Sequence, residues 1–129
     1  METVSQGGGQ VTIFTEVLGK TLTAVERHAD EKLVFRFDDG TVYKMYHAQS
    51  CCESVAIEDI VGDLDDLTGS PLLEAEEVIS CPDPSTNPSG ESATWTFYKF
   101  GTASGSVTIR WYGTSNGYYS ESATFRRVR

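Results

Sequence analysis

The chain has 129 residues, of which 39% are hydrophobic and 11% aromatic, and a formal net charge of −9. This length fits one domain, and the apolar content is too high for a disordered chain. The N-terminus lacks a basic region followed by an apolar stretch, and no run approaches the roughly 18 apolar residues of a membrane helix. We therefore expect no membrane association and a cytoplasmic location, with residues 1–10 as a flexible tail and residues 11–129 as a single domain.

Acidic residues are concentrated in the middle of the chain, where no Lys or Arg occurs between Lys44 and Lys99. The acids of this interval are Glu53, Glu58, Asp59, Asp63, Asp65, Asp66, Glu74, Glu76, Glu77, Asp83 and Glu91. Such a negative field repels phosphates and attracts cations. We therefore expect no direct nucleic-acid binding, whereas a basic partner would be attracted.

The first half of the chain is rich in strand signals. The segments "QVTIFTEV" and "KTLTAVE" have the β-branched residues typical of strands, with Gly19 between them. In "KLVFRF" the apolar residues alternate; "DDG" then supplies a turn and "TVYKMYH" returns. This pattern predicts a β-hairpin.

The acidic middle mixes strand and helix signals. "SVAIEDI" predicts a strand that runs into a turn of helix, and we expect one short helix near Glu58–Leu67, ending before Gly69 and Pro71. The run "EDIVGDLDDL" lacks the spacing of a calcium loop, so we interpret it as a solvated face. "PLLEAEEVIS" fits either a strand or a short helix, and the proline-rich "CPDPSTNPSGES" predicts an exposed loop.

The last forty residues predict a three-stranded antiparallel meander of "ATWTFYKF", "VTIRWYG" and "YYSESATF". Trp95 and Phe97 alternate with polar residues and Tyr98, and Val107, Ile109 and Trp111 alternate in the next strand; we expect these five side chains to face the core. The fold class that follows is α+β, a single domain dominated by antiparallel β-sheet with one or two short helices.

Three strings carry a resemblance to a known kind of protein: "FDDGTVYKMYH", "CCESVAIEDIVGDLDDLTGSPLLEAEE" and "TWTFYKF…VTIRWYG.SNGYYSES". Together, from about Leu18 to Phe125, they resemble a family of small proteins of unknown function from bacteriophage genomes and prophage regions. The resemblance implies a phage source. It implies no reaction or ligand, and it draws attention to "CCES" and "SNGYYSE".

The adjacent cysteines Cys51 and Cys52 lie near His47, which suggests a metal or nucleophile site. Adjacent cysteines lack the Cys-x₂-Cys spacing of zinc sites, and in an extended segment they point to opposite faces. An acidic neighbourhood also raises the pKa of a thiol, which opposes nucleophilic catalysis. We expect reduced thiols that pack in the interior, with no metal and no cofactor, while a binding site formed by His47, Cys51 and Cys52 stays open as an alternative.

Aromatic residues near the chain end suggest a contact surface. Its candidate members are Tyr98, Arg110, Tyr112, Asn116, Tyr118 and Tyr119. An aromatic platform with one guanidinium can stack on a ligand or grip a partner. The alternative is that these tyrosines complete the core or cover a sheet edge, with the hydroxyl in water.

The functional expectation is a small, non-enzymatic phage accessory protein that binds a host protein or a small signalling ligand of host defence, in the host cytoplasm during infection. One alternative is a virion component such as a capsid decoration protein. Another is a ligand-binding protein or enzyme with a Cys/His/Tyr site. Homo-oligomerisation through sheet edges stays open.

Overall fold

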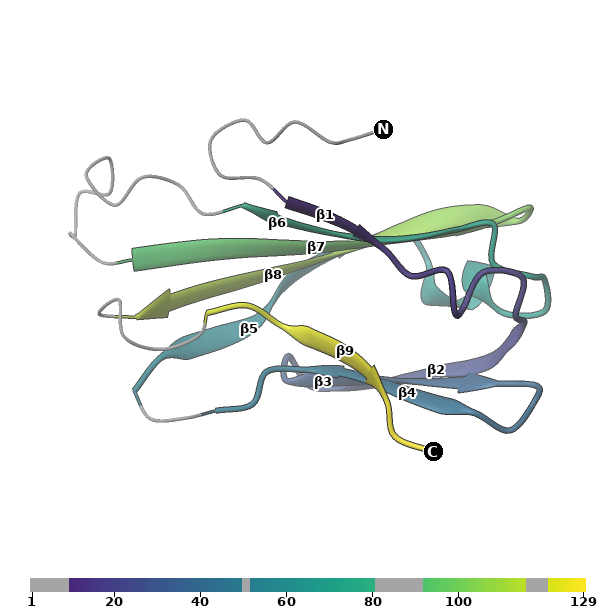
Figure 1. Ribbon diagram of the computed structural model, residues 1–129, viewed down its shortest axis with the longest axis horizontal. Coiled ribbons are helices and arrows are strands. Elements are labelled where there is room, and N and C mark those ends of the chain that lie inside the picture. Colours follow the sequence, from purple (N-terminus) through teal and green to yellow (C-terminus); the bar gives the residue numbers. More distant parts are fainter. Residues whose placement is uncertain (1–9, 50–51, 81–91, 116–120) are drawn as a thin grey trace.

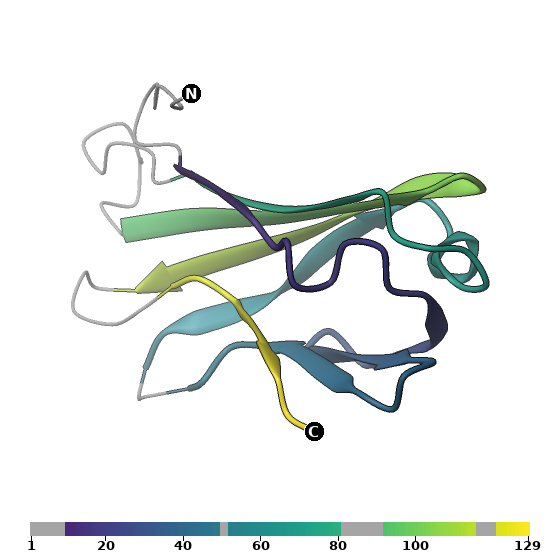
Figure 2. The same cartoon turned by 45° about the vertical axis from the view of Figure 1, so that its right-hand side comes forward.

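The computed structural model describes residues 10–49, 52–80, 92–115 and 121–129. The expected tail up to residue 9, the proline-rich loop at 81–91 and the turn at Asn116-Gly117 lie outside these residues. The described residues form two antiparallel β-sheets that lie one above the other (Figure 1). Figure 2 shows the same two layers from a second direction.

The larger sheet has five strands in the spatial order β1-β6-β7-β8-β5. Their bounds are β1 Gln10–Ile13, β6 Glu74–Ser80, β7 Ser92–Thr102, β8 Gly105–Ser115 and β5 Ser54–Val61. The smaller sheet has the order β2-β3-β4-β9. Its strands are β2 Leu22–His28, β3 Lys32–Phe37, β4 Val42–Tyr46 and β9 Thr124–Arg127.

The core lies between the two sheets, and several of its aromatic rings pack around Phe125. The Phe125 ring centroid lies 5.1 Å from that of Tyr43, 5.3 Å from Phe35 and 5.7 Å from Phe100. Alternation along each strand explains this packing, because Leu33, Phe35 and Phe37 of one strand all point to one side. The predicted hairpin of "KLVFRF" and "TVYKMYH" is confirmed as β3 and β4.

The α+β expectation is not confirmed: the described residues are mostly antiparallel strand, and the helical element among them is the short 3₁₀ helix η1, Leu64–Leu67. The helix expected from Glu58 was wrong over its first half, since Glu58–Val61 belong to β5. Pairing with β8 and the β-branched residues of "SVAIEDIV" favour a strand there. The ambiguous "PLLEAEEVIS" contains β6.

The predicted core face of β7 was also wrong. Ala103 and Ser104 form a two-residue turn that pairs Thr102 with Gly105, so Trp95 lies opposite Tyr112 and Thr96 opposite Trp111. Cross-strand partners share a face of the sheet. Because Trp111 is buried in the core, its partner Thr96 also points inward, and the neighbouring Trp95 therefore points outward.

The third strand of the expected meander lies elsewhere. Thr124–Arg127 forms β9, which pairs with β4 in the smaller sheet. The second neighbour of β8 is β5, from the middle of the chain. The chain therefore leaves the larger sheet after β8 and ends in the other layer, which places Phe125 in the core between them.

Candidate functional site

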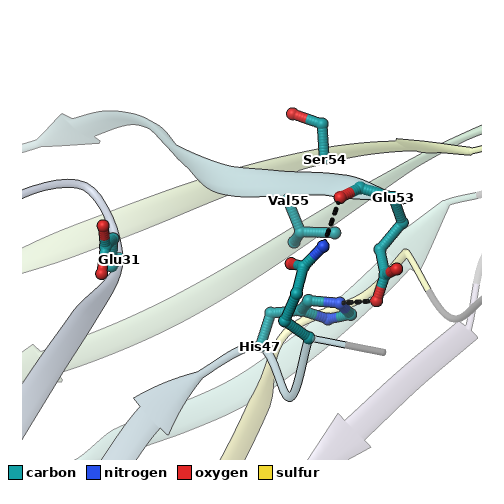
Figure 3. Close-up of a pocket in the computed structure, with 6 residues that line it drawn as sticks. Glu31, His47, Glu53, Ser54 and Val55 are labelled. Carbon is teal, nitrogen blue, oxygen red and sulfur yellow. Dashed lines mark hydrogen bonds and ion pairs between the residues drawn. The ribbon is translucent and has the colours of Figure 1, made fainter. Parts of the chain in front are cut away.

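A buried imidazole and a buried carboxylate meet where the two sheets come together. His47 follows β4, Glu53 precedes β5, and His47 Nε2 lies 2.7 Å from Glu53 Oε2 (Figure 3). The exposed fractions of the two side chains are 4% and 0%. The other ring nitrogen, Nδ1, lies 2.9 Å from the carbonyl oxygen of Ser122, just before β9.

The contacts of His47 fix which ring nitrogen carries a proton. A carbonyl oxygen only accepts, so Nδ1 must donate to Ser122. The contact between Nε2 and Glu53 then holds one proton, on either the nitrogen or the carboxyl oxygen. Both nitrogens of His47 are thus engaged within the protein, and neither presents a lone pair to a substrate.

A pocket of about 410 Å³ opens beside this pair. Its lining residues are Glu31, His47, Gln49, Glu53, Ser54 and Val55. The Gln49 amide donates to the Glu53 carbonyl at 2.6 Å, and Glu31 lines the pocket from the turn between β2 and β3 (Figure 3). With one proton on Nδ1 and one in the contact with Glu53, the His47–Glu53 pair carries no net charge, so Glu31 is the lining acid that disfavours an anion.

The cysteine predictions need correction at Cys52. This residue is exposed and disulfide-bonded, so it is neither a reduced thiol nor interior packing. Cys51 and Cys81 lie outside the described residues. A nucleophilic thiolate or a zinc-binding thiolate is therefore not available at Cys52.

The outer surface of the larger sheet carries a second candidate site, here called the outer aromatic face: Trp95, Phe97, Arg110 and Tyr112. The Trp95 ring centroid lies 4.4 Å from that of Tyr112 and 6.3 Å from that of Phe97. The Arg110 guanidinium lies 5.5 Å from the Trp95 ring centroid. All four side chains are half-buried, and no described element is layered over them (Figures 1 and 2).

Arg110 is held in place from β5. Its Nε donates to Glu58 Oε1 at 2.6 Å, and its terminal nitrogen lies 3.6 Å from Asp59 Oδ2. A bulge in β5 between Ile57 and Asp59 lets both acids reach the same guanidinium. These contacts fix the planar group over Trp95, so the face is ordered before any partner arrives.

The predicted site residues other than the cysteines separate into four groups. Arg110 and Tyr112 lie together on the outer aromatic face, whereas His47 lies at the pocket. Tyr98 is fully buried in the core, where burial raises the pKa of its hydroxyl, and it is not part of the surface. Asn116, Tyr118 and Tyr119 lie outside the described residues. The sequence prediction did not place Trp95 and Phe97 on the outer surface. The two-residue turn after Thr102 sets the register of β7 against β8, and it was the sequence signal that could have placed both residues there.

A family model described as a domain of unknown function (DUF7448) matches residues 15–125. The chain belongs to the DUF7448 family. The matched span includes both the His47–Glu53 pair and the outer aromatic face, so the two candidate sites are part of the DUF7448 domain. No curated protein and no solved structure matches the chain.

Two further findings on this DUF7448 domain concern metal ions and membranes. The described residues contain no group of three or more His, Cys, Asp or Glu side chains placed to hold a metal ion. In that same part of the chain, no helix has the length and apolar character needed to cross a bilayer.

Proposed function

We propose that this protein is a small phage accessory protein that acts by binding a host protein, without catalysis, through its outer aromatic face. The observation that carries the proposal is the cluster of Trp95, Phe97 and Tyr112 around a fixed Arg110. Aromatic residues and arginine are the types most enriched at the energetic centres of protein interfaces. The phage setting rests on the sequence resemblance.

The surroundings of this face favour a basic partner. Glu58 and Asp59 border it on β5, and Glu76 borders it on β6 opposite Lys99. Arg110 is already paired with two of these acids, so the net charge around the aromatic rings is negative. A host surface with an apolar centre and a basic rim would be complementary to it.

The pocket beside His47 gives less support to a small signalling ligand than the outer aromatic face gives to a host protein. Its wall carries the carboxyl group of Glu31, which disfavours anionic, nucleotide-like signals. Both ring nitrogens of His47 are engaged in internal contacts, so His47 offers no free nitrogen to act as a general base in this pocket.

Site-specific photo-crosslinking tests the proposal. A photoreactive amino acid replaces Phe97 on the outer aromatic face or, as the control, Val34 on the outer surface of the smaller sheet. In infected host cells we expect a crosslinked host protein at position 97 and not at position 34. We further expect this adduct to disappear in the Trp95→Ala/Tyr112→Ala background and to persist with Tyr46→Ala.

Three outcomes would contradict the proposal. Adducts at position 34 that match those at position 97 would mean that contact is not specific to this face. Adducts with capsid proteins, together with the protein in purified particles, would favour the virion alternative. A small molecule retained in native mass spectrometry of the purified protein, with no adduct at position 97, would favour the ligand-binding alternative.

A further inference from the structure

The outer surface of the smaller sheet carries positive charge, in contrast to the rest of this acidic chain. Lys32, Lys44 and Arg126 all lie on this surface, here called the basic face. Lys44 and Arg126 are direct cross-strand partners between β4 and β9. Like charges directly opposite each other destabilise a sheet, so folding alone does not explain this pair.

No described carboxylate neutralises the cations of the basic face. Within the described residues, no carboxylate lies within 4 Å of Lys32, Lys44 or Arg126. Glu26 lies on the same surface but is already paired with Arg36, whose Nε lies 2.8 Å from Glu26 Oε2. The Lys44 ammonium lies 4.5 Å from the Tyr46 ring centroid, which holds it over the sheet. The face is therefore available to an anionic partner.

The same molecule carries a complementary acidic surface at one end of the sandwich, formed by Asp63, Asp65, Asp66 and Glu74 and here called the acidic end. Asp66 and Glu74 both approach the turn between β7 and β8: a Cβ on Gly105 would lie 3.0 Å from Asp66 Oδ2, and one on Gly101 would lie 3.1 Å from Glu74 Oε1. In the described part of the chain, none of the four acids has a Lys, Arg or His partner within 4 Å.

Exposed apolar side chains accompany both surfaces. Among the described residues, the large hydrophobic side chains that are exposed are Val61 at 59%, Leu73 at 69% and Val128 at 50%. Val61 and Leu73 immediately precede the segments that carry the acidic end, and Val128 follows β9 beside the basic face. Each charged surface therefore has an apolar neighbour that an interface could bury.

We propose that copies of this chain associate head to tail, with the acidic end of one copy on the basic face of the next. A compact patch of four acids flanked by the exposed Leu73 is opposite in charge to the basic face and offers apolar area beside it. The two surfaces differ, so the contact is heterologous and extends into short chains. This proposal does not depend on the outer aromatic face.

Sedimentation velocity of the full chain at rising concentration tests the proposal. In about 50 mM salt we expect the sedimentation coefficient to rise with concentration, and in about 500 mM salt we expect a monomer, because screening weakens exposed charge contacts. K44Q/R126Q on the basic face and D65N/E74Q at the acidic end should each raise the dissociation constant by about tenfold or more. The matched controls R27Q/K99Q and D30N/D38N change the net charge equally and should associate like the wild type.

Mixing the two patch variants tests the polarity of the contact. K44Q/R126Q retains the acidic end and D65N/E74Q retains the basic face, so an equal mixture should form 1:1 dimers and nothing larger. Circular dichroism checks that both variants are folded. A wild-type monomer at every concentration in low salt would overturn the proposal, as would association that both patch variants retain. A monomeric wild type that binds a single-stranded oligonucleotide, with binding lost in K44Q/R126Q, would instead assign the basic face to phosphate.

Discussion

Glu53 and His47 form a buried pair, with 2.7 Å between Oε2 and Nε2 and almost no exposure of either side chain. Through them the entrance to β5 in the larger sheet is joined to the end of β4 in the smaller sheet. The bond from Nδ1 of His47 to the Ser122 carbonyl adds the segment before β9. The pair therefore connects three chain segments from both layers at one point.

Removing one member of this pair should destabilise the protein strongly. We expect Glu53→Ala to lower the free energy of unfolding by about 3–5 kcal/mol, because it leaves a buried polar group without its partner. Glu53→Gln should cost less, since its amide can still donate to a neutral imidazole. Urea unfolding measures both. Glu58→Ala is the control, because its ion pair with Arg110 is exposed and contributes about 0–1 kcal/mol. Equal losses for Glu53→Ala and Glu58→Ala would contradict the structural role assigned to the buried pair.

Gly113 lies where β8 passes close to the chain before β9. A Cβ at this position would lie 2.1 Å from the Glu121 carbonyl oxygen and 2.9 Å from Val55 Cγ2. We expect Gly113→Ala to lower the free energy of unfolding by at least about 1 kcal/mol, because the backbone must shift to relieve the contact. Gly101→Ala is the control, since its nearest neighbour is the movable Glu74 side chain at 3.1 Å. Thermal unfolding of both variants should rank them in that order, and the reverse order would count against the close approach.

Local patterns predicted the parts of the fold that depend on neighbouring residues. The β3–β4 hairpin could be predicted because alternation and the "DDG" turn lie in one short segment. The face of β7 could not be predicted from composition, because Thr94 and Thr96 point inward while Trp95 and Phe97 point outward. Register decides between these two faces, and a shift of one residue inverts them.

Contacts between distant segments explain the remaining errors. β9 pairs with β4 across about eighty residues of chain, although β8 is much closer in sequence. The pair of His47 with Glu53 needs β4, β5 and the Ser122 carbonyl in place, and the sequence shows only that an acid follows the cysteines. Arg110 and Tyr112 lie on one face because residues two apart in a strand share a face, and this much follows from local sequence.

Glu121 has a buried carboxyl group that accepts hydrogen bonds from hydroxyl groups at the ends of β7 and β8. Its Oε1 accepts from Thr94 Oγ1 at 2.8 Å and from Ser92 Oγ at 3.2 Å, and its Oε2 accepts from Ser115 Oγ. We expect Glu121→Ala to cost about 1.5–3 kcal/mol, the usual contribution of a hydrogen bond to a charged group. In a double-mutant cycle with Thr94→Val, the two losses should be non-additive by about 0.5–3 kcal/mol. Simple additivity would show that the hydroxyl and the carboxylate do not act together.

Asp39 should stabilise the protein at neutral pH and lose this effect in acid. The Thr41 hydroxyl and backbone N–H, together with Lys20, lower the pKa of its carboxyl below the ordinary value of 3.8. The ionised form is favoured by folding, so the contribution is present above pH 3.8 and disappears as the pH falls through the lowered value. We expect Asp39→Asn to be less stable than the wild type at pH 6, with a difference that shrinks progressively as the pH falls below 3.8. Asp38→Asn, at the neighbouring position in the same turn, is the control. A constant difference across this range would exclude the linkage.

Glu77 should show the opposite dependence on pH. It lies opposite Tyr98 on the inner side of β6, and burial raises the pKa of its carboxyl, an effect that the Tyr98 hydroxyl only partly offsets. Because the folded-state pKa lies above the ordinary value of 4.5, folding favours the protonated form. The destabilisation is therefore absent below pH 4.5 and grows as the pH rises through the raised value. We expect Glu77→Gln to be more stable than the wild type at pH 7 and nearly equal to it at pH 4, measured by urea unfolding at both values. Glu76→Gln, on the opposite side of the same strand, should show no such change, and a gain for Glu77→Gln that is equal at both pH values would point to packing and not to ionisation.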